Sequence, residues 1–145
     1  MNQERETTVR EIMMSAPVTL GPEDTLDTAN DLVTLGRIRH IPILDKGRLV
    51  GILSQRQLLG PAAGTILGVK GKAKKALLKG FRVKDVMRFP VTTASANTTV
   101  KDAARLMAEK KVGCLPVVDN GSLLGLITAT DILRYVANNL KAEER

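Results

Sequence analysis

Residues 39–54, RHIPILDKGRLVGILS, return as residues 113–128, GCLPVVDNGSLLGLIT, with a constant offset of 74. A proline, an aspartate and two glycines hold the same places in both copies, and apolar residues fill most positions between them. Two apolar runs joined by Asp-Lys-Gly or Asp-Asn-Gly are typical of a β-hairpin, because Gly and Asn tolerate the positive φ angles of a tight turn. We therefore expect two copies of one folding unit, and a cleft between such copies is a natural place for a ligand.

The repeat extends to both sides of the hairpin. Residues 9–13 return as residues 83–87, and Pro-Val-Thr at 17–19 returns at 90–92 with an offset of 73. We expect strands at residues 41–44 and 49–53, with copies at 115–118 and 123–127. Each copy reads as a helix, two strands and a second helix, which gives a mixed α/β (α+β) fold with two pseudo-symmetric units. The sequence thus divides into a first repeat at 9–59, a basic linker rich in Gly and Lys at 60–80, and a second repeat at 81–140.

Each copy is expected to hold a helix before its hairpin and another after it. Thr25 and Thr99 suit the N-caps of the first pair of helices, and the last helices begin after Ser54 and Thr128. Apolar residues recur at helical spacing in these segments. The expected apolar faces consist of Leu26, Ala29, Leu32, Val33 and Gly36, of Val100, Ala103, Ala104, Leu106 and Met107, and of Ile132, Leu133, Val136, Ala137 and Leu140.

The linker at residues 60–80 is strongly basic. Its lysines are Lys70, Lys72, Lys74, Lys75 and Lys79, and Ala73, Ala76, Leu77 and Leu78 would allow a short helix. We interpret it first as a solvated linker. It could also contact the phosphates of a ligand, a nucleic acid or the acidic face of a partner protein. Nucleic acid is not the partner we expect, because no aromatic residues or known nucleic-acid motif accompany the lysines.

The 145 residues carry a formal net charge of +7, which favours anionic partners and which we take to be spread over the whole surface. The chain has one His and one Cys, His40 and Cys114, at equivalent places in the repeat. Cys114 interrupts an apolar strand, so we expect a small core residue and not a nucleophile. With no third group to orient a His–Cys pair and no metal-binding cluster, we expect no enzymatic activity and no metal site. A lone cysteine fits the reducing cytoplasm, and no apolar run is long enough to cross a membrane.

The repeated motifs resemble the cystathionine-β-synthase (CBS) domain. The resemblance rests on the Pro-Val-Val-Asp-x-Gly turn, on the closing Gly-Leu-Ile-Thr-x-x-Asp and on the order of elements, twice and in register, from about residue 9 to 139. Two copies resemble the CBS pair, or Bateman module. Residues 38–42 and 112–116 are especially similar to small stand-alone bacterial CBS-pair proteins of the acetoin-utilisation regulatory type.

This resemblance implies a regulatory module with one β-α-β-β-α unit per copy. It also implies two sheets packed together and two clefts for adenosine compounds: AMP, ADP, ATP or S-adenosylmethionine. The aspartate of the closing motif, here Asp131, would bind the ribose hydroxyls, because a carboxylate accepts two hydrogen bonds from a diol. It also implies a homodimer built through apolar helix faces and a protein effector that reads the ligand state. The residues that the resemblance assigns to the ligand are Pro17, Val18, Thr19, Ile38, Arg39, His40, Ile41, Pro42, Thr128, Thr130 and Asp131.

Within that set Arg39 is the expected phosphate ligand, because its guanidinium presents a planar, charged fork to phosphate oxygens. His40 would add charge when protonated. Thr128 and Asp131 also suit a simple helix N-terminus, as N-cap and as first-turn charge. The first copy departs from the motif, since Gln57 stands where Asp is expected, and Arg56 beside it could reach a phosphate. We therefore expect one working cleft. The alternative is an interaction module with empty clefts, whose basic segment binds nucleic acid or an acidic protein.

Overall fold

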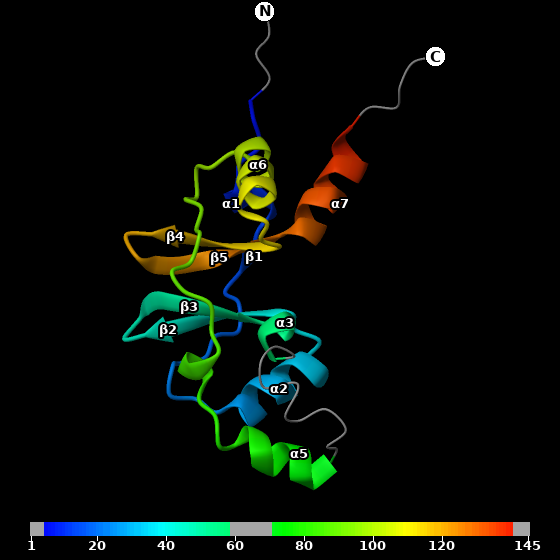
Figure 1. Ribbon diagram of the computed structural model, residues 1–145. Helices are drawn as coiled ribbons and strands as arrows, with labels where there is room; N and C mark the ends of the chain where they lie inside the picture. Colours follow the sequence, from blue (N-terminus) through cyan, green and yellow to red (C-terminus); the bar gives the residue numbers. More distant parts are fainter. Residues whose placement is uncertain (1–4, 59–70, 141–145) are drawn as a thin grey trace, which may run out of the picture. The chain divides into compact units, whose positions relative to one another are not determined.

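The computed structural model describes residues 5–58 and 71–140 (Figure 1). The chain forms two compact units, one of Met1–Ala16 with Thr92–Arg145 and one of Pro17–Val91. We name them the discontinuous unit and the continuous unit. Each unit combines the hairpin of one repeat with a segment that belongs, by sequence, to the other repeat. The compact units and the repeats in the sequence are therefore two different divisions of the chain.

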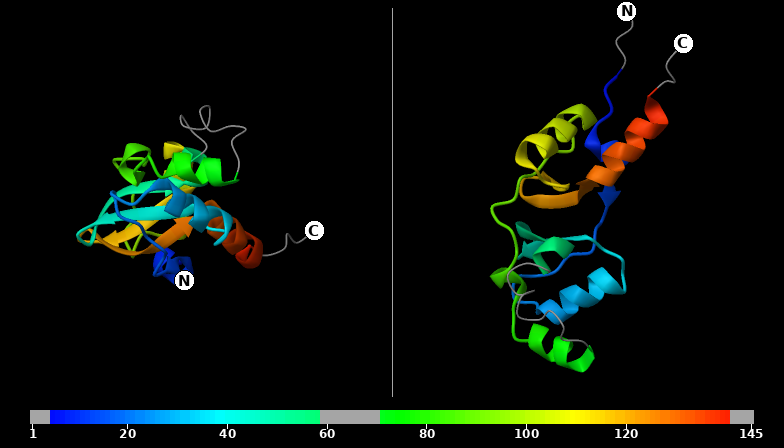
Figure 2. Two further views of the ribbon diagram at one scale, coloured as in Figure 1. Left: turned by 90° about the horizontal axis from the view of Figure 1, so that it is seen from below. Right: turned by 45° about the vertical axis from the view of Figure 1, so that its right-hand side comes forward.

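The continuous unit is built on a two-stranded antiparallel sheet of β2 (His40–Asp45) and β3 (Arg48–Ser54). Helix α2 (Leu26–Thr34) covers one face of this sheet, and α5 (Gly71–Leu78) lies beyond α2 (Figures 1 and 2). Helix α3 (Gln55–Leu58) follows β3 directly, and a 3₁₀ turn, η1 (Val83–Asp85), follows α5.

The discontinuous unit is built on a three-stranded sheet in the order β1 (Met14–Ser15), β5 (Ser122–Thr128), β4 (Cys114–Asp119). Its helices are α1 (Val9–Ile12), α6 (Val100–Lys110) and α7 (Ala129–Asn139). The N-terminal segment is held to this unit by backbone hydrogen bonds from Val9 N to Thr98 O at 2.8 Å and from Val100 N to Thr7 O at 2.9 Å. The mixed α/β fold expected from the sequence is confirmed.

Both predicted hairpins are present, and each strand extends one residue beyond its predicted range at both ends. The turns have positive φ at both central residues: 52° and 80° at Lys46 and Gly47, and 51° and 83° at Asn120 and Gly121. Two successive positive φ angles give the turn type whose twist matches that of paired strands. The Asp-x-Gly signal thus identified the turn correctly, even with lysine in one left-handed position.

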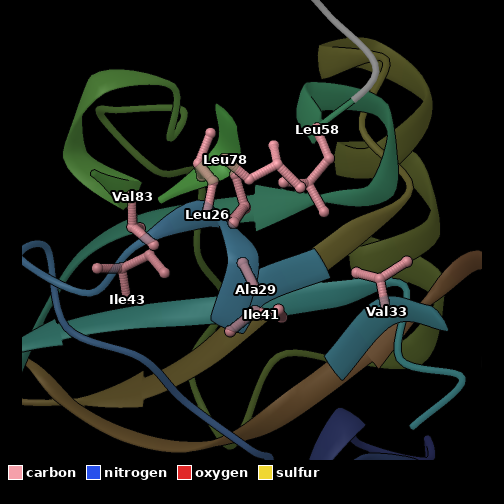
Figure 3. Close-up of a cluster of buried hydrophobic side chains, with 9 residues drawn as sticks. Leu26, Ala29, Val33, Ile41, Ile43, Leu58, Leu78 and Val83 are labelled. Atoms are coloured by element: carbon pink, nitrogen blue, oxygen red, sulfur yellow. The ribbon is translucent and has the colours of Figure 1, made fainter. Parts of the chain in front are cut away.

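The core of the continuous unit lies between the sheet, α2 and α5 (Figure 3). Ile41 and Ile43 of β2 meet Leu26 and Ala29 of α2, and Leu78 of α5 joins the same cluster. The short helix expected within the basic segment is therefore confirmed, and it is anchored in the core. The remainder of that segment, up to Lys70, lies outside the described residues. Gly36, expected on the apolar face of α2, is exposed beyond its end.

The two N-cap threonines differ in what they bond. Thr99 Oγ1 accepts a hydrogen bond from Asp102 N at 3.0 Å, which caps α6 as expected. Thr25 holds the N-cap place of α2, but its hydroxyl donates to the carboxylate of buried Asp27 and caps no backbone N–H. That bond gives the buried carboxylate a partner and is the largest cause of its lowered pKa.

Candidate functional site

Residues 17–19 lie along the free edge of β2 in the continuous unit. Leu20, which follows them, donates from its backbone N to Pro42 O at 3.2 Å, and Leu44 N donates to Leu20 O at 2.9 Å. These bonds fix the segment beside β2 because the other edge of β2 is occupied by β3. Pro17 and Thr19 are half-buried and Val18 is exposed.

Within residues 38–42, the side chains of Arg39 and His40 are accessible, and those of Ile41 and Pro42 are enclosed. Arg39 is exposed, His40 is half-buried, and Ile41 and Pro42 are buried in the core. Arg39 O accepts a hydrogen bond from Gln55 N at 3.0 Å, and His40 pairs with Ser54 across the sheet. The basic pair therefore lies beside the start of α3. Because their side chains are buried, Ile41 and Pro42 can offer a ligand only their backbone atoms.

The pKa of His40 is lowered from its ordinary value, first by burial and then by the positive charge of Arg39. Both causes disfavour the imidazolium form. The ring is therefore mainly neutral at pH 7, and the protonated form considered from the sequence requires more acid conditions. Arg39 is the group of this pair that carries charge at neutral pH.

Thr128 and Asp131 form a capping box at the start of α7 in the discontinuous unit. Asp131 Oδ2 accepts hydrogen bonds from Thr128 N and Thr128 Oγ1, both at 2.9 Å, and Thr128 Oγ1 accepts from Asp131 N at 3.2 Å. This reciprocal arrangement satisfies donors that the helix itself leaves without partners. The N-cap interpretation of these two residues is thus confirmed, and it uses only one carboxylate oxygen.

The second oxygen of Asp131 faces a different environment. Asp131 Oδ1 stands 3.7 Å from Arg134 Nη1, and the Asp131 side chain keeps 21% of its exposure. Thr130 beside it is exposed. Because the cap already holds Oδ2, the carboxylate reaches the surface as a rigid acceptor whose remaining lone pairs lie on Oδ1.

Ser54 and Gln57 repeat the capping box at the start of α3. Gln57 Oε1 accepts a hydrogen bond from Ser54 N at 2.8 Å and another from the Ser54 hydroxyl, and Gln57 N donates to Ser54 Oγ at 3.3 Å. The amide oxygen is consumed in this way, so the group left over at Gln57 is the Nε2 donor. Gln57 therefore preserves the helix cap. The side-chain atom left outside the cap is a donor in Gln57, whereas it is an acceptor in Asp131.

The discontinuous unit also contains a counterpart of the edge segment that the sequence analysis did not assign. Ala94 N donates to Pro116 O at 2.9 Å, and Val118 N donates to Ala94 O at 2.9 Å, as Leu20 does with Pro42 and Leu44 in the other unit. Ala129 N donates to Gly113 O at 2.9 Å, matching Gln55 and Arg39. The sequence analysis matched residues 17–19 to residues 90–92 with an offset of 73 but gave the copy no role at a ligand. Leu20 and Ala94 take the same place at an offset of 74, the offset of the hairpins.

Comparison with known proteins identifies these two hairpin units. A family model described as the CBS domain matches residues 9–62 and 83–138. The chain belongs to the CBS-domain family. The tandem CBS pair expected from the repeated motifs is thereby confirmed.

Several solved CBS-pair structures are similar over almost the whole chain. A Vibrio cholerae protein assigned to acetoin utilization (AcuB) is 33% identical, with a TM-score of 0.76 over 92% of this chain and 93% of the other. CBSX2 in complex with AMP is 29% identical, with a TM-score of 0.74 over 91% and 97%. The CBS pair of protein MJ0100, in complex with 5-methylthioadenosine and S-adenosyl-L-methionine, is 25% identical, with a TM-score of 0.76 over 94% and 100%.

Other relatives are much longer proteins. The chain spans 33% of an uncharacterized protein from Methanocaldococcus jannaschii and 21% of an inosine-5′-monophosphate dehydrogenase from Thermoplasma acidophilum. Among residues 5–58 and 71–140 every helix is too short or too polar to span a bilayer. The same residues contain no group of three or more His, Cys, Asp or Glu side chains able to hold a metal ion.

Cys114 of the second CBS repeat is a buried core residue, as expected. Burial is the first cause that raises the pKa of its thiol to about 12, and the negative charge of Asp131 is the second. Because the thiolate is the nucleophilic form, a thiol with this pKa is unreactive at neutral pH. His40, its counterpart in the repeat, lies in the other compact unit.

The positive charge is not spread over the whole CBS pair, which corrects the expectation from composition. The continuous unit has thirteen Lys and Arg residues against six Asp and Glu, whereas the discontinuous unit has nine of each. The entire excess of +7 therefore belongs to residues 17–91. Five of these excess charges are the lysines of residues 60–80, so the unevenness was already visible in the sequence as the basic linker.

Proposed function

We propose that this CBS pair is a regulatory module that binds an adenosine compound. The observation that carries the proposal is the carboxylate of Asp131, whose Oδ2 is held by the cap while Oδ1 remains outside it, 3.7 Å from Arg134 Nη1. The adenosine compounds in the CBSX2 and MJ0100 structures, both similar over more than nine-tenths of this chain, support it. AMP, ADP, ATP and S-adenosylmethionine are the candidate ligands.

In this proposal the ribose hydroxyls donate to Asp131, with Thr128 and Thr130 beside it. A carboxylate suits a diol because it accepts two hydrogen bonds and offers no competing donor. Residues 17–19 contact the adenine through backbone groups and apolar surface. Arg39 binds phosphate oxygens or another anionic group, while His40, Ile38, Ile41 and Pro42 complete the wall, the last two through their backbone.

The first repeat provides a weaker ribose site. Gln57 presents a donor where Asp131 presents an acceptor, so a diol at that position loses one of its two favourable hydrogen bonds. Arg56 and the Gln57 amide favour an anionic or acceptor group instead. We therefore propose a stoichiometry of one strongly bound adenosine ligand per chain.

Regulation requires that the ligand bind two arrangements of the pair with different affinity, since equal affinity would shift no equilibrium. The affected surface would be read by a protein effector or by a second copy. No catalytic step is proposed for this chain. The reducing cytoplasm is the proposed location, because the lone Cys114 is a buried thiol that needs no oxidising compartment.

A homodimer is proposed through α6 and α7. A groove of about 280 Å³ lies between them, lined by apolar side chains that include Met107, Ile132 and Leu133. No residue of α7 is buried, and Leu133 and Leu140 are 68% and 72% exposed. A second copy of the same face would cover this apolar stripe in a closed two-fold dimer.

Calorimetric titration of the purified protein with AMP, ADP, ATP and S-adenosylmethionine in turn tests the proposal. Saturable heat near one site per chain with at least one of them is the expected result. Asp131→Ala should weaken that binding more than tenfold, which corresponds to about 1.4 kcal/mol or more. Absence of heat with all four compounds would overturn the proposal, and unchanged affinity in the variant would remove Asp131 from the ribose site.

A further inference from the structure

Helix α5 carries a basic face that the adenosine proposal does not use. Lys72, Lys75 and Lys79 are exposed, whereas Lys74 and Leu77 are half-buried and Leu78 is buried. Lys72 and Lys75 are spaced three apart on α5, and Lys79, in the turn after Leu78, continues the same side of the helix. The exposure of these three lysines directs the basic face toward solvent, and α5 itself lies beyond α2 in its own unit (Figure 2).

Most cations of the continuous unit, Lys72 and Lys79 among them, form no ion pair with the described residues. Among the described residues, only Lys75 of this face forms an ion pair, with Asp31 at 3.5 Å. By contrast, Lys84 pairs with Glu23 at 2.8 Å, and Arg82 Nη1 donates to Glu23 O at 2.8 Å. Lys72 is thus placed to bind an external anion. Lys79 forms no ion pair with the described residues, although its charge contributes to the lowered pKa of Asp27. Both lysines belong to the unit that holds the whole charge excess.

We propose that the basic face of α5, Lys72, Lys75 and Lys79, binds the phosphate backbone of double-stranded DNA without reading its sequence. Duplex DNA carries one negative charge per about 1.7 Å of axis, which a row of exposed lysines can neutralise with release of counterions. Only alanines, Ala73 and Ala76, lie between the lysines on the exposed surface of α5. Backbone contacts of this kind position a protein on DNA and carry no sequence information.

The chemistry of the face distinguishes this partner from others. None of the exposed large hydrophobic residues lies on α5, so it lacks the apolar or aromatic anchor that protein interfaces have at their centre. Single-stranded nucleic acid needs aromatic platforms for its bases, and α5 has none. Insertion into a membrane surface needs an exposed apolar face, but Leu77 and Leu78 of α5 point into the core.

Fluorescence anisotropy with a short labelled duplex tests this proposal on the full chain. The double variant Lys72→Gln with Lys79→Gln leaves the Lys75–Asp31 pair in place. Its matched control is Lys101→Gln with Lys110→Gln, two exposed lysines of α6 without a recorded ion pair in the described residues. Both double variants remove two positive charges from a helix surface. A difference between their affinities for the duplex therefore reports where the charges lie and not the net charge. Thermal unfolding of each variant checks that it folds as the parent does.

The parent protein is expected to bind duplexes of unrelated sequence equally, with affinity falling steeply as salt rises. The α5 double variant should lose about tenfold in affinity at low salt, and its log–log salt slope should fall by about 0.9 for each phosphate contact removed. The α6 double variant should stay within about twofold of the parent. Equal losses in the two variants, or binding that does not depend on salt, would overturn the proposal. Tighter binding of poly-glutamate than of the duplex would also overturn it, in favour of an acidic protein.

Discussion

Met13 packs against Gly125, and a Cβ added to this glycine would stand 2.7 Å from Met13 Sδ and 2.5 Å from Met14 O. The second contact is with the backbone of β1, which pairs with β5 at this position. The same relationship recurs in the continuous unit, where Met87 lies against Gly51. Gly51 and Gly125 are therefore required because another segment of chain crosses them at close range.

Gly125→Ala is expected to destabilise the protein by about 1–3 kcal/mol, the usual cost of overpacking a filled site, because the Met14 carbonyl cannot move without loosening β1. Gly51→Ala should cost less, since its closest neighbour is the flexible Met87 side chain and its nearest backbone atom, Arg88 O, is 3.3 Å away. Gly21→Ala is the control, because its added Cβ meets nothing closer than 3.6 Å. Denaturant unfolding measures all three, and an equal loss in Gly21→Ala would contradict this account.

Asp131→Asn separates ligand binding from helix capping. The Asn side chain keeps an amide oxygen for the bonds from Thr128 and turns the outward atom into a donor, as in Gln57. We expect unfolding free energy within about 0.5 kcal/mol of the parent, because the cap survives, and adenosine affinity lowered more than tenfold. Gln57→Asp makes the converse change and should raise the number of sites detected by calorimetry. If the stoichiometry stays the same, the difference between the two repeats has another origin.

His40 should make stability depend on pH in mildly acid solution. Its pKa in the folded state is lowered from 6.5, so the unfolded chain binds the proton more tightly. The contribution of His40 to stability is therefore complete above about pH 7. It decreases as the pH drops through 6.5 toward the lower pKa of the folded state. Glu11, whose pKa is lowered to about 2, acts in a separate window below pH 5. His40→Gln should flatten the unfolding free energy between pH 7 and 5; an unchanged slope would show that another group titrates there.

Cys114 should resist thiol reagents in the folded protein. Its thiol is buried and has a pKa of about 12, so almost no thiolate is present at pH 8. Reaction with an aromatic disulfide reagent at pH 8 is expected to be slow and to accelerate sharply when the protein is unfolded in denaturant. Rapid stoichiometric reaction of the native protein would show that β4 opens readily.

Leu133 tests the proposed dimer face. Leu133→Glu places a charge on the apolar stripe of α7 without removing a buried contact, since this side chain is 68% exposed. We expect the variant to be a monomer when its molar mass is measured by light scattering during size exclusion. Its thermal stability at low protein concentration should equal that of the parent. Lys72→Glu, at an exposed position of α5 in the continuous unit, is the control and should leave the oligomeric state as it is. A variant that still forms the parent's dimer would exclude α7 from the interface.

The sequence predicted the hairpins and their turns closely because their signals are local: alternating apolar residues and an Asp-x-Gly turn. It also predicted the caps at Thr99 and Thr128 from the same kind of local chemistry. It did not predict that Val9 bonds to Thr98 or that Leu26 bonds to Phe81, because these contacts join distant segments and leave no pattern in either one. The concentration of charge in residues 17–91 was visible in part as the basic linker, whereas the inclusion of residues 81–91 in the same unit depends on such contacts.

The capping role of Gln57 was available in the sequence, because Ser-x-x-Gln is a capping-box pattern. It was treated as a loss of the aspartate when the motif was compared with its copy. The structure shows that the helix cap and the outward-facing atom are separate properties of this position. Only the second of them differs between the repeats.

Each compact unit includes a segment that belongs, by sequence, to the other repeat. This arrangement also affects the order in which the chain can fold during its synthesis. The continuous unit, Pro17–Val91, is complete once its last residue leaves the ribosome. The segment of residues 5–16 is made first, yet its partners in α6 and β5 are made last, so it must wait for most of the chain. Closing that long loop is the slower step, because contacts between distant residues carry a larger entropic cost. A pause or a truncation after residue 91 would thus leave one finished unit and one unpaired N-terminal strand.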